Sequence, residues 1–359
     1  MQSFIICKRL MQVNSIQDFE LCRFKFLEMI NKQEVITKQK KDSIHYREMR
    51  ATDMPKILKL WEESSGWGAI TKDQFNSWYL DTPYGPCLTA VAEGVGGAIL
   101  GQLIFAPTQL VLNGKSVKVL KALAPILHEK LRKQNLIKDS HPIVKLIKVG
   151  NSIASKRGFH LIYSFPAHAW LGLFKSFPRF GLPECQSQSF NCQGIAIQKR
   201  LKPSGYSVKE LSFFTNEVNA LWEDAIIELP INCAIIRDQH WLNWKWGDHF
   251  KFGMYNQDGL LMGYVVIDRS TYLIKDVLAK SEGMLHLLIN QVLDHLYDTK
   301  DQYNIKQVKV MYTSLMARIL KGLSLEAIDY RFAFNIYSIS AKYEVASLHA
   351  DEWYMMPND

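Results

Sequence analysis

The sequence predicts an α/β (α+β) protein made of two tandem halves, each with a mixed, mostly antiparallel sheet flanked by helices. From His45 onward, short apolar strands alternate with amphipathic helices and glycine turns. Four features also recur at offsets of 162, 161, 166 and 162 residues, found by subtracting positions: Glu48 and Glu210, Trp61 and Trp222, Trp78 and Trp244, Gly101 and Gly263. Such a constant offset indicates two copies of one fold.

The first copy begins with a strand at 45–49 and a helix capped by Thr52 that runs to about residue 64. A short helix at 75–80 ends in a turn cluster. Turns at Gly96-Gly97 and Asn113-Gly114 then separate short strands. The predicted elements that follow are strands at 88–93, 98–107, 109–112 and 118–127, a helix at 141–157, a strand at 159–165, a helix at 167–177 and a strand at 187–197.

Three segments are therefore expected. Residues 1–43 form a helical extension that ends in a lysine-rich linker, residues 44–200 form the first domain, and residues 201–359 form the second. In the second domain, residues 274–279 are the strand equivalent to 118–127, and a helix begins at about Met284.

Composition and charge exclude several classes of protein. The net charge is +8, but no Lys/Arg block is dense enough to predict DNA binding. The six cysteines form no CxxC pair, which predicts reduced thiols. No secretory signal or long apolar run is found, so we expect a cytoplasmic protein without a membrane partner. The scattered histidines predict no metal site.

The order of elements in each half, strand, two helices, antiparallel strands, then helix, strand, helix and strand, resembles the GNAT N-acyltransferases, above all bacterial proteins with a tandem pair of such domains. Residues 127–136, LHEKLRKQNL, resemble the family's signature loop between a strand and a helix. Arg132 fits the first position of its Gln/Arg-x-x-Gly-x-Gly/Ala pattern, while Asn135 and Ile137 replace the two glycines.

The resemblance implies an acyl-CoA, acetyl-CoA or another, as the acyl donor and co-substrate. Backbone N–H groups at the end of strand 118–127 would hold the thioester carbonyl, and the loop would hold the phosphates. The expected donor-site residues are Leu123, Ala124, Leu127, Arg132, Lys133 and Asn135. The second half has one glycine and no arginine at the equivalent loop, which implies a degenerate copy that shapes the substrate cleft.

Direct transfer to a primary amine needs a base and an acid. Glu129 and His128 adjoin the strand end and are candidate bases, as is Glu93. The family often uses a tyrosine as the acid in the helix after strand 159–165. That helix has none here, and Tyr163 is the nearest candidate. Trp241, Trp244 and Trp246 either line an aromatic pocket or belong to the core.

The leading hypothesis is an N-acyltransferase, in first place an N-acetyltransferase, that acts on the amine of a small molecule, sugar or peptide. The substituted loop and the missing tyrosine keep a non-catalytic binding or scaffold protein as an alternative. A related transferase that uses aminoacyl-tRNA is a third, weakly favoured by the basic charge. The sequence leaves a homodimer open.

Overall fold

The computed structural model describes residues 44–132, 138–199, 205–229, 231–299, 305–343, 345, 353–357 and 359. The predicted N-terminal extension, residues 1–43, lies outside these residues. Lys133 and Asn135 of the predicted donor loop also lie outside them.

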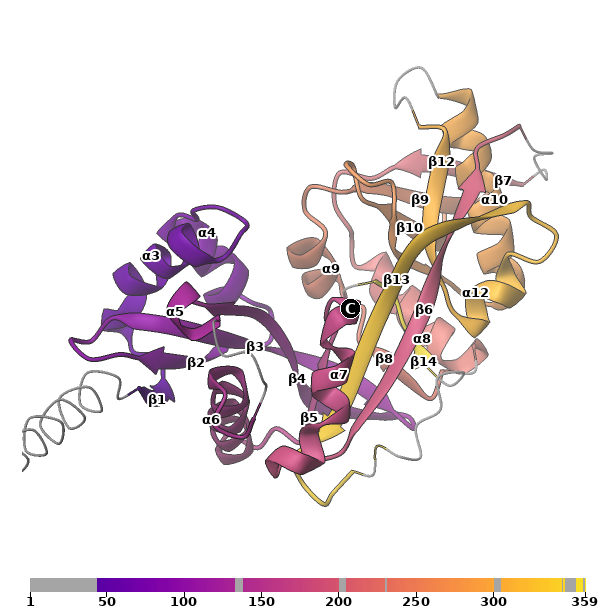
Figure 1. Ribbon diagram of the computed structural model, residues 1–359. Helices are drawn as coiled ribbons and strands as arrows, with labels where there is room; N and C mark the ends of the chain where they lie inside the picture. The colour runs from indigo at the N-terminus through magenta and orange to yellow at the C-terminus, as the bar shows by residue number, and fades with distance from the viewer. Residues whose placement is uncertain are drawn as a thin grey trace, which may run out of the picture.

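One large sheet runs through most of the molecule (Figure 1). Its main path is β1 (His45–Glu48), β2 (Leu88–Glu93), β3 (Ile99–Leu112), β4 (Lys115–Leu127), β5 (Leu161–Ser164), β13 (Leu325–Ser338), β6 (Cys185–Ala196) and β12 (Gln307–Tyr312). Two short strands, β8 (Cys233–Ile235) and β14 (Trp353–Tyr354), extend it beside β3. All neighbouring strands of the main path are antiparallel except β4 and β5.

A second, antiparallel sheet continues the same surface. Its order is β11 (Ile274–Ala279), β10 (Leu261–Ile267), β9 (Phe250–Asn256) and β7 (Tyr206–Glu210). A parallel bridge between Leu273 and Lys309 connects the β11 side of this sheet to β12. The two sheets therefore meet at β11 and β12.

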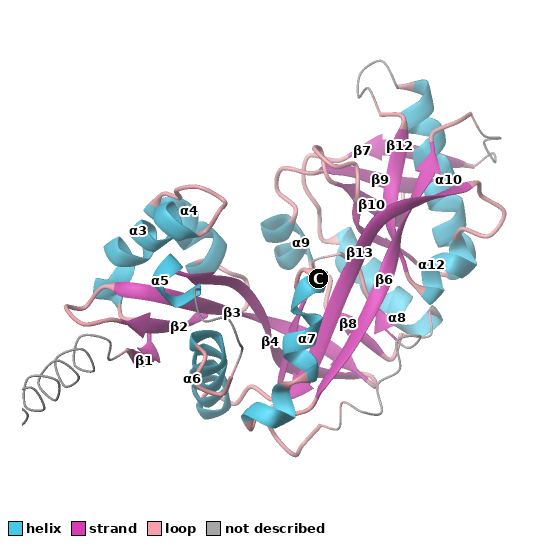
Figure 2. Cartoon of the chain, viewed as in Figure 1, coloured by secondary structure: helices cyan, strands magenta, loops and turns pink. Residues whose placement is uncertain are grey.

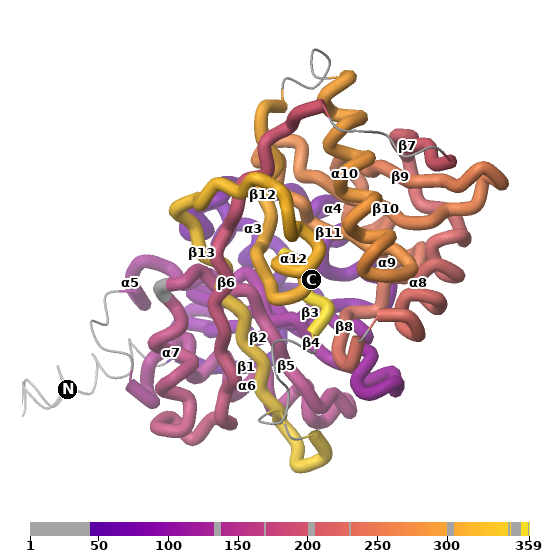
Figure 3. Tube along the Cα trace, turned by 90° about the vertical axis from the view of Figure 1, so that its right-hand side faces the viewer, coloured from indigo at the N-terminus to yellow at the C-terminus, as the bar shows by residue number. Residues whose placement is uncertain are grey.

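The two halves arrange their first five strands in the same order, starting from opposite ends of the combined sheet. From one end it runs β1, β2, β3, β4 and β5, and from the other β7, β9, β10, β11 and β12. Between them, β13 pairs with β5 and β6 pairs with β12, so the last strand of each half lies in the other half's sheet. Figure 3 shows β6 and β13 side by side from a second direction. The predicted division at residue 200 stays a prediction. Each half contributes one strand that pairs with a strand of the other half.

Helices cover both faces of the sheet (Figure 2). The short helix η1 (Ala51–Asp53), α3 (Met54–Ser64), α4 (Lys72–Phe75) and η2 (Asn76–Leu80) lie on one face of β2–β4, and α6 (Pro142–Lys156) lies on the other. The remaining helices are α5 (Glu129–Arg132), η3 (His168–Trp170), α7 (Leu171–Lys175), η4 (Phe177–Phe180), α8 (Glu217–Glu228), α9 (Gln239–Lys245), α10 (Glu282–Asp298) and α12 (Ser314–Ile319). The mixed, mostly antiparallel sheet with flanking helices confirms the predicted fold class.

The recurring residues fall on corresponding elements. Glu48 and Glu210 end β1 and β7, Trp61 and Trp222 lie in α3 and α8, and Gly101 and Gly263 lie in β3 and β10. Trp78 lies in η2 and Trp244 in α9. Among the described residues, no helix is long and apolar enough to cross a bilayer.

Two local predictions were wrong. Thr52 does not cap the helix, because it lies inside η1 and the residue that precedes α3 is Asp53. The Asp53 carboxylate accepts the N–H of Arg50 at 2.7 Å and pairs with Arg47. The strands predicted at 98–107 and 109–112 are one strand, β3, which passes through Pro107. On one edge, β3 pairs with β2 up to Phe105 and with β8 from Leu110. Pro107 lies between these pairings, where a residue without an N–H is tolerated.

Candidate active site

Strands β4 and β5 separate near the middle of the molecule. They are paired at only three positions, and the last pair is Lys121 with Tyr163. Strand β4 then continues from Ala122 to Leu127 with no further β5 partner among the described residues. This edge of β4 has no paired strand among the described residues, and backbone N–H and C=O groups need partners.

A bulge in β4 lies within this separated stretch. Gln102 pairs with Ile126 but Ile104 pairs with Leu123, so Ala124 and Pro125 both lie opposite a single residue of β3. Ala124 has φ 49°, a left-handed conformation that is uncommon for alanine. The bulge redirects the backbone of β4 where the strands diverge.

A cleft of about 1220 Å³ opens at this point. One side is apolar, and its residues come from β3, β4, α6, α7 and η4 and belong to one buried cluster. They are Leu103, Ala122, Leu127, Ile143, Ile147, Leu173, Phe174 and Phe177. The other side is aromatic and charged, with Trp67, Trp78, Trp244, Trp246, Lys121, Lys245, Lys275, His249 and Asp268.

Four of the predicted donor-site residues line this cleft: Leu123, Ala124, Leu127 and Arg132. The Arg132 guanidinium donates to the backbone oxygen of Leu127 at 2.6 Å and to that of Ser64. Its side chain thereby ties the end of β4 to the end of α3. This use of Arg132 competes with the phosphate binding that the sequence predicted, and the roles of all four residues stay predictions.

The three predicted catalytic residues are not among those that line the cleft. Glu129 is exposed on α5, and the Nδ1 atom of its neighbour His128 accepts the N–H of Lys130 at 3.3 Å. Tyr163 is 3% exposed and packs against Phe165 and Phe334, and burial raises its pKa well above the usual range. The structure therefore does not bring these side chains together at the cleft.

Glu93, the other candidate base, is also engaged elsewhere. Its carboxylate accepts a 2.7 Å hydrogen bond from Arg47, which lowers its pKa. The Trp-rich segment divides between the two alternatives left open by the sequence. Trp244 and Trp246 line the cleft, and Trp241 and Trp246 belong to the core.

Three lysines that the sequence analysis missed face the cleft. Lys121 comes from β4, Lys245 from α9 and Lys275 from β11. Burial lowers the pKa of each, and the effect is strongest at Lys121. The Nζ atom of Lys275 lies 3.8 Å from a carboxylate oxygen of Asp268, and the Nε2 atom of His249 lies 3.3 Å from the same oxygen.

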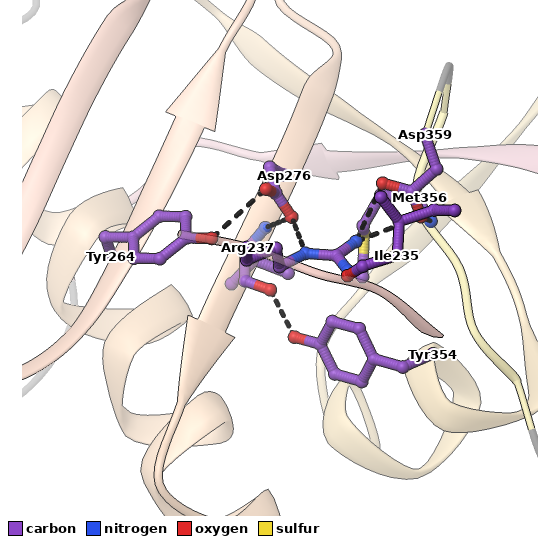
Figure 4. Close-up of polar contacts among 8 residues, drawn as sticks. Ile235, Arg237, Tyr264, Asp276, Tyr354, Met356 and Asp359 are labelled. Atoms are coloured by element: carbon purple, nitrogen blue, oxygen red, sulfur yellow. Dashed lines mark hydrogen bonds and ion pairs between the residues drawn. The ribbon is translucent and has the colours of Figure 1, made fainter. Parts of the chain in front are cut away.

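A buried polar cluster joins Arg237, Tyr264, Asp276 and Asp359 (Figure 4). Arg237 donates to Asp276 at 2.8 Å and to both carboxylate oxygens of Asp359 at 2.8 and 2.9 Å. Tyr264 donates to Asp276 at 3.1 Å. Burial raises the pKa of Asp276 to about 6 despite the opposing effect of Arg237. The charge of Asp359 acts to raise the pKa of both Lys121 and Lys245.

Among the described residues, no group of His, Cys, Asp and Glu side chains is arranged to hold a metal ion. No model of a known protein family matches the sequence, and no curated protein matches it. The informative likenesses are to solved structures.

The chain has the fold of the GNAT-type N-acyltransferases. It is similar to a GCN5-related N-acetyltransferase from Anabaena variabilis, with a TM-score of 0.60 and 13% identity over 83% of this chain and 73% of that one. It is also similar to a probable N-acyltransferase from Enterococcus faecalis, with a TM-score of 0.58 and 12% identity over 81% and 72%. A third similar structure is Saccharomyces cerevisiae N-myristoyltransferase with bound myristoyl-CoA, with a TM-score of 0.53 and 11% identity over 82% and 79%.

Proposed function

We propose that the protein is an acyl-CoA-dependent N-acyltransferase that moves an acyl group directly from the thioester to a primary amine. The observation that carries the proposal is the separation of β4 from β5 next to a bulge, at a cleft whose lining residues come from elements on both faces of β4. A donor on one side and an amine on the other would meet at Ala124. All three similar structures described above are named as acyltransferases, and one holds an acyl-CoA.

The residues present fit an acyl-CoA. The free edge of β4 offers backbone N–H groups to the thioester and to the amide groups of the donor. Pro125 cannot donate, so the N–H groups nearest the bulge are those of Leu123 and Ala124. Helix α6 begins at Pro142 and lines the cleft with Ile143, and its N-terminal end favours a phosphate there.

The apolar side of the cleft favours an acyl chain longer than acetyl. Ile143 and Ile147 of α6 face Leu173 and Phe174 of α7 around it. An acetyl group would cover little of this wall. Each methylene that a longer chain buries contributes about 0.8 kcal/mol, or about fourfold in affinity. The acceptor is then a primary amine of a small molecule, sugar or peptide on the aromatic side.

Calorimetry with acetyl-, butyryl-, octanoyl- and decanoyl-CoA tests the donor. We expect binding that tightens by up to about fourfold per methylene until the apolar side is filled. Ile147→Trp would fill this side and weaken octanoyl-CoA binding while leaving acetyl-CoA binding near wild type. Ile227→Trp is the matched control, because Ile227 is 80% exposed on α8.

A folded protein that binds none of these thioesters would overturn the proposal and favour the non-catalytic binding or scaffold alternative. Binding that does not depend on chain length would instead favour acetyl-CoA as the donor. Release of free CoA thiol in the presence of a panel of amines then identifies the acceptor class.

A further inference from the structure

Lys121 occupies the point where β4 and β5 part. It is the last residue of β4 that pairs with β5, and it lies three positions before Ala124 of the bulge. At about 3.3 Å per residue, these two Cα atoms are roughly 10 Å apart along β4. Its Nζ atom lies 5.5 Å from the centre of the Phe165 ring and faces the cleft.

Lys245 approaches the same point from α9. Its Nζ lies 5.7 Å from the Trp244 ring and 5.5 Å from the Trp246 ring. Lys121 and Lys245 both line the cleft, and the charge of Lys245 lowers the pKa of Lys121.

The surroundings favour the neutral amine at Lys121. Burial lowers the pKa of Lys121 most, and the charges of Lys245 and Lys275 lower it further. Burial also lowers the pKa of Lys245, but less strongly. A desolvated lysine beside a second cation is a known way to obtain a reactive neutral amine near pH 7.

Other charged groups facing the pair do not reverse this order. Asp359 raises the pKa of both lysines, but its carboxylate is already bonded to Arg237. Lys275 has Asp268 as its nearby carboxylate. Cys87, which also faces Lys245, is a thiol whose pKa burial raises to about 12, so it carries no charge at neutral pH.

We propose that Lys121 is the general base that removes a proton from the acceptor's ammonium group, and that Lys245 is the positioning residue that keeps Lys121 neutral. This proposal rests on the proposed acyl transfer. It replaces the bases predicted from the sequence, Glu129 and His128, with a side chain that lines the cleft.

The proton balance is complete with these groups. The acceptor R–NH₃⁺ gives one proton to the Lys121 amine and becomes R–NH₂, which attacks the thioester carbon. The tetrahedral intermediate expels the CoA thiolate and forms the amide. The second proton of the acceptor nitrogen goes to that thiolate, and protonated Lys121 returns its proton to solvent.

Residue-resolved titration tests the base without an acceptor. The intact protein is trace-labelled with acetic anhydride over a pH series, and mass spectrometry of its peptides gives the reactivity of each lysine. We expect the titration midpoint of Lys121 to lie below that of Lys156, an exposed residue of α6. Lys245→Met should raise the Lys121 midpoint, and Lys59→Met, a change at an exposed residue of α3, should leave it unchanged.

A second measurement does not depend on the labelling reagent, which can react slowly inside the cleft. In protein with ¹³Cε-labelled lysine, the Lys121 signal is assigned by its loss in Lys121→Arg and followed with pH. A Lys121 midpoint equal to or above that of Lys156 overturns the proposal. A midpoint that does not respond to Lys245→Met removes the role given to Lys245.

Kinetics with an acylated amine separate a base from a fixed positive charge. Lys121→Arg places a permanently charged group where the proposal needs a neutral amine and cannot accept a proton, so kcat should fall by about 10²- to 10⁴-fold, with acyl-CoA affinity unchanged. Wild-type kcat in Lys121→Arg overturns the base and favours a lysine that binds an anionic acceptor. Failure of every acyl-CoA to bind, with a low Lys121 midpoint, overturns the acyl transfer and with it the step assigned to Lys121.

Discussion

Arg237 and Asp359 form an ion pair inside the protein, in which one guanidinium nitrogen donates to both carboxylate oxygens. The same guanidinium donates to Asp276, and its carbon lies 4.9 Å from the centre of the Tyr354 ring. The two partners lie 122 residues apart in the sequence. The pair anchors the last described residue of the chain in the protein interior.

Replacing Arg237 should strongly destabilise the fold. Arg237→Met leaves the carboxylates of Asp276 and Asp359 buried without their cation, and breaking a buried pair costs about 3–5 kcal/mol. Urea unfolding followed by circular dichroism measures this. Arg318→Ala is the control, since Arg318 pairs with Glu282 at the surface, where a pair contributes at most about 1 kcal/mol. Equal losses in the two variants would contradict a structural role for the buried pair.

The left-handed conformation of Ala124 gives a second prediction. Ala124→Val should destabilise the protein by about 1–2 kcal/mol or more, because a β-branched residue is strained at φ 49°. Ala124→Gly should change stability by less than about 1 kcal/mol, since the relief of strain offsets the entropy of glycine. Ala122→Val, which adds the same methyl groups in the same cleft without a positive φ, is the control for bulk. Thermal unfolding of the three variants decides, and equal losses in both valine variants would show that bulk alone matters.

Asp268 makes stability depend on pH in acid. Burial acts to raise the pKa of Asp268, but hydrogen bonds from Ser270 and Thr271 outweigh it and hold the pKa well below the usual range. A carboxyl with a lowered pKa in the folded state contributes stability above its unfolded pKa, and that stability is lost as pH falls. Wild type should therefore be more stable than Asp268→Asn at pH 6, and the difference should shrink as pH falls below about 4. Urea unfolding of both proteins over a pH series measures it, and a difference that grows toward low pH would contradict the assignment.

Much of the local structure was predictable because its signals lie close together in the chain. The turn at Asn113-Gly114 joins β3 to β4, and Pro142 begins α6 with His141 as its cap. The resemblance of this strand and its following loop to the GNAT signature region implied Leu123, Ala124 and Leu127 as donor-site residues, and all three line the cleft. These features depend on the residues of one strand, turn or helix.

The lysines of the cleft could not be predicted in the same way, because Lys121, Lys245 and Lys275 meet only through long-range pairing of three elements. A signal was nevertheless present. Lys121 interrupts the apolar run VLKALAPIL, and Lys245 stands between two tryptophans. A lysine within an apolar or aromatic run is rarely a plain surface charge, since burial of an unpaired ammonium is costly.

The exchange of β6 and β13 between the halves was also beyond the sequence. The repeat predicted two equivalent copies, and either pairing of the last strands would satisfy the same alternation of side chains. Only the contacts of β13 with β5 and of β6 with β12 distinguish them. The partners of these two strands were therefore not predictable from the sequence.

The two glycines that reveal the repeat should differ in their response to substitution. A Cβ atom at Gly263 would lie 2.7 Å from the backbone oxygen of Leu278 and 2.9 Å from the Cβ of Ala279, and neither atom can move without its strand. At Gly101 the nearest atom, 2.9 Å away, is the end of the flexible Leu127 side chain. Gly263→Ala should therefore cost about 1–3 kcal/mol, as overpacking does, and Gly101→Ala clearly less. Because Leu127 lines the cleft, Gly101→Ala should change acyl-CoA affinity more than stability. Urea unfolding and calorimetry of both variants measure the two effects, and a larger stability loss at Gly101 would contradict the packing assigned to these strands.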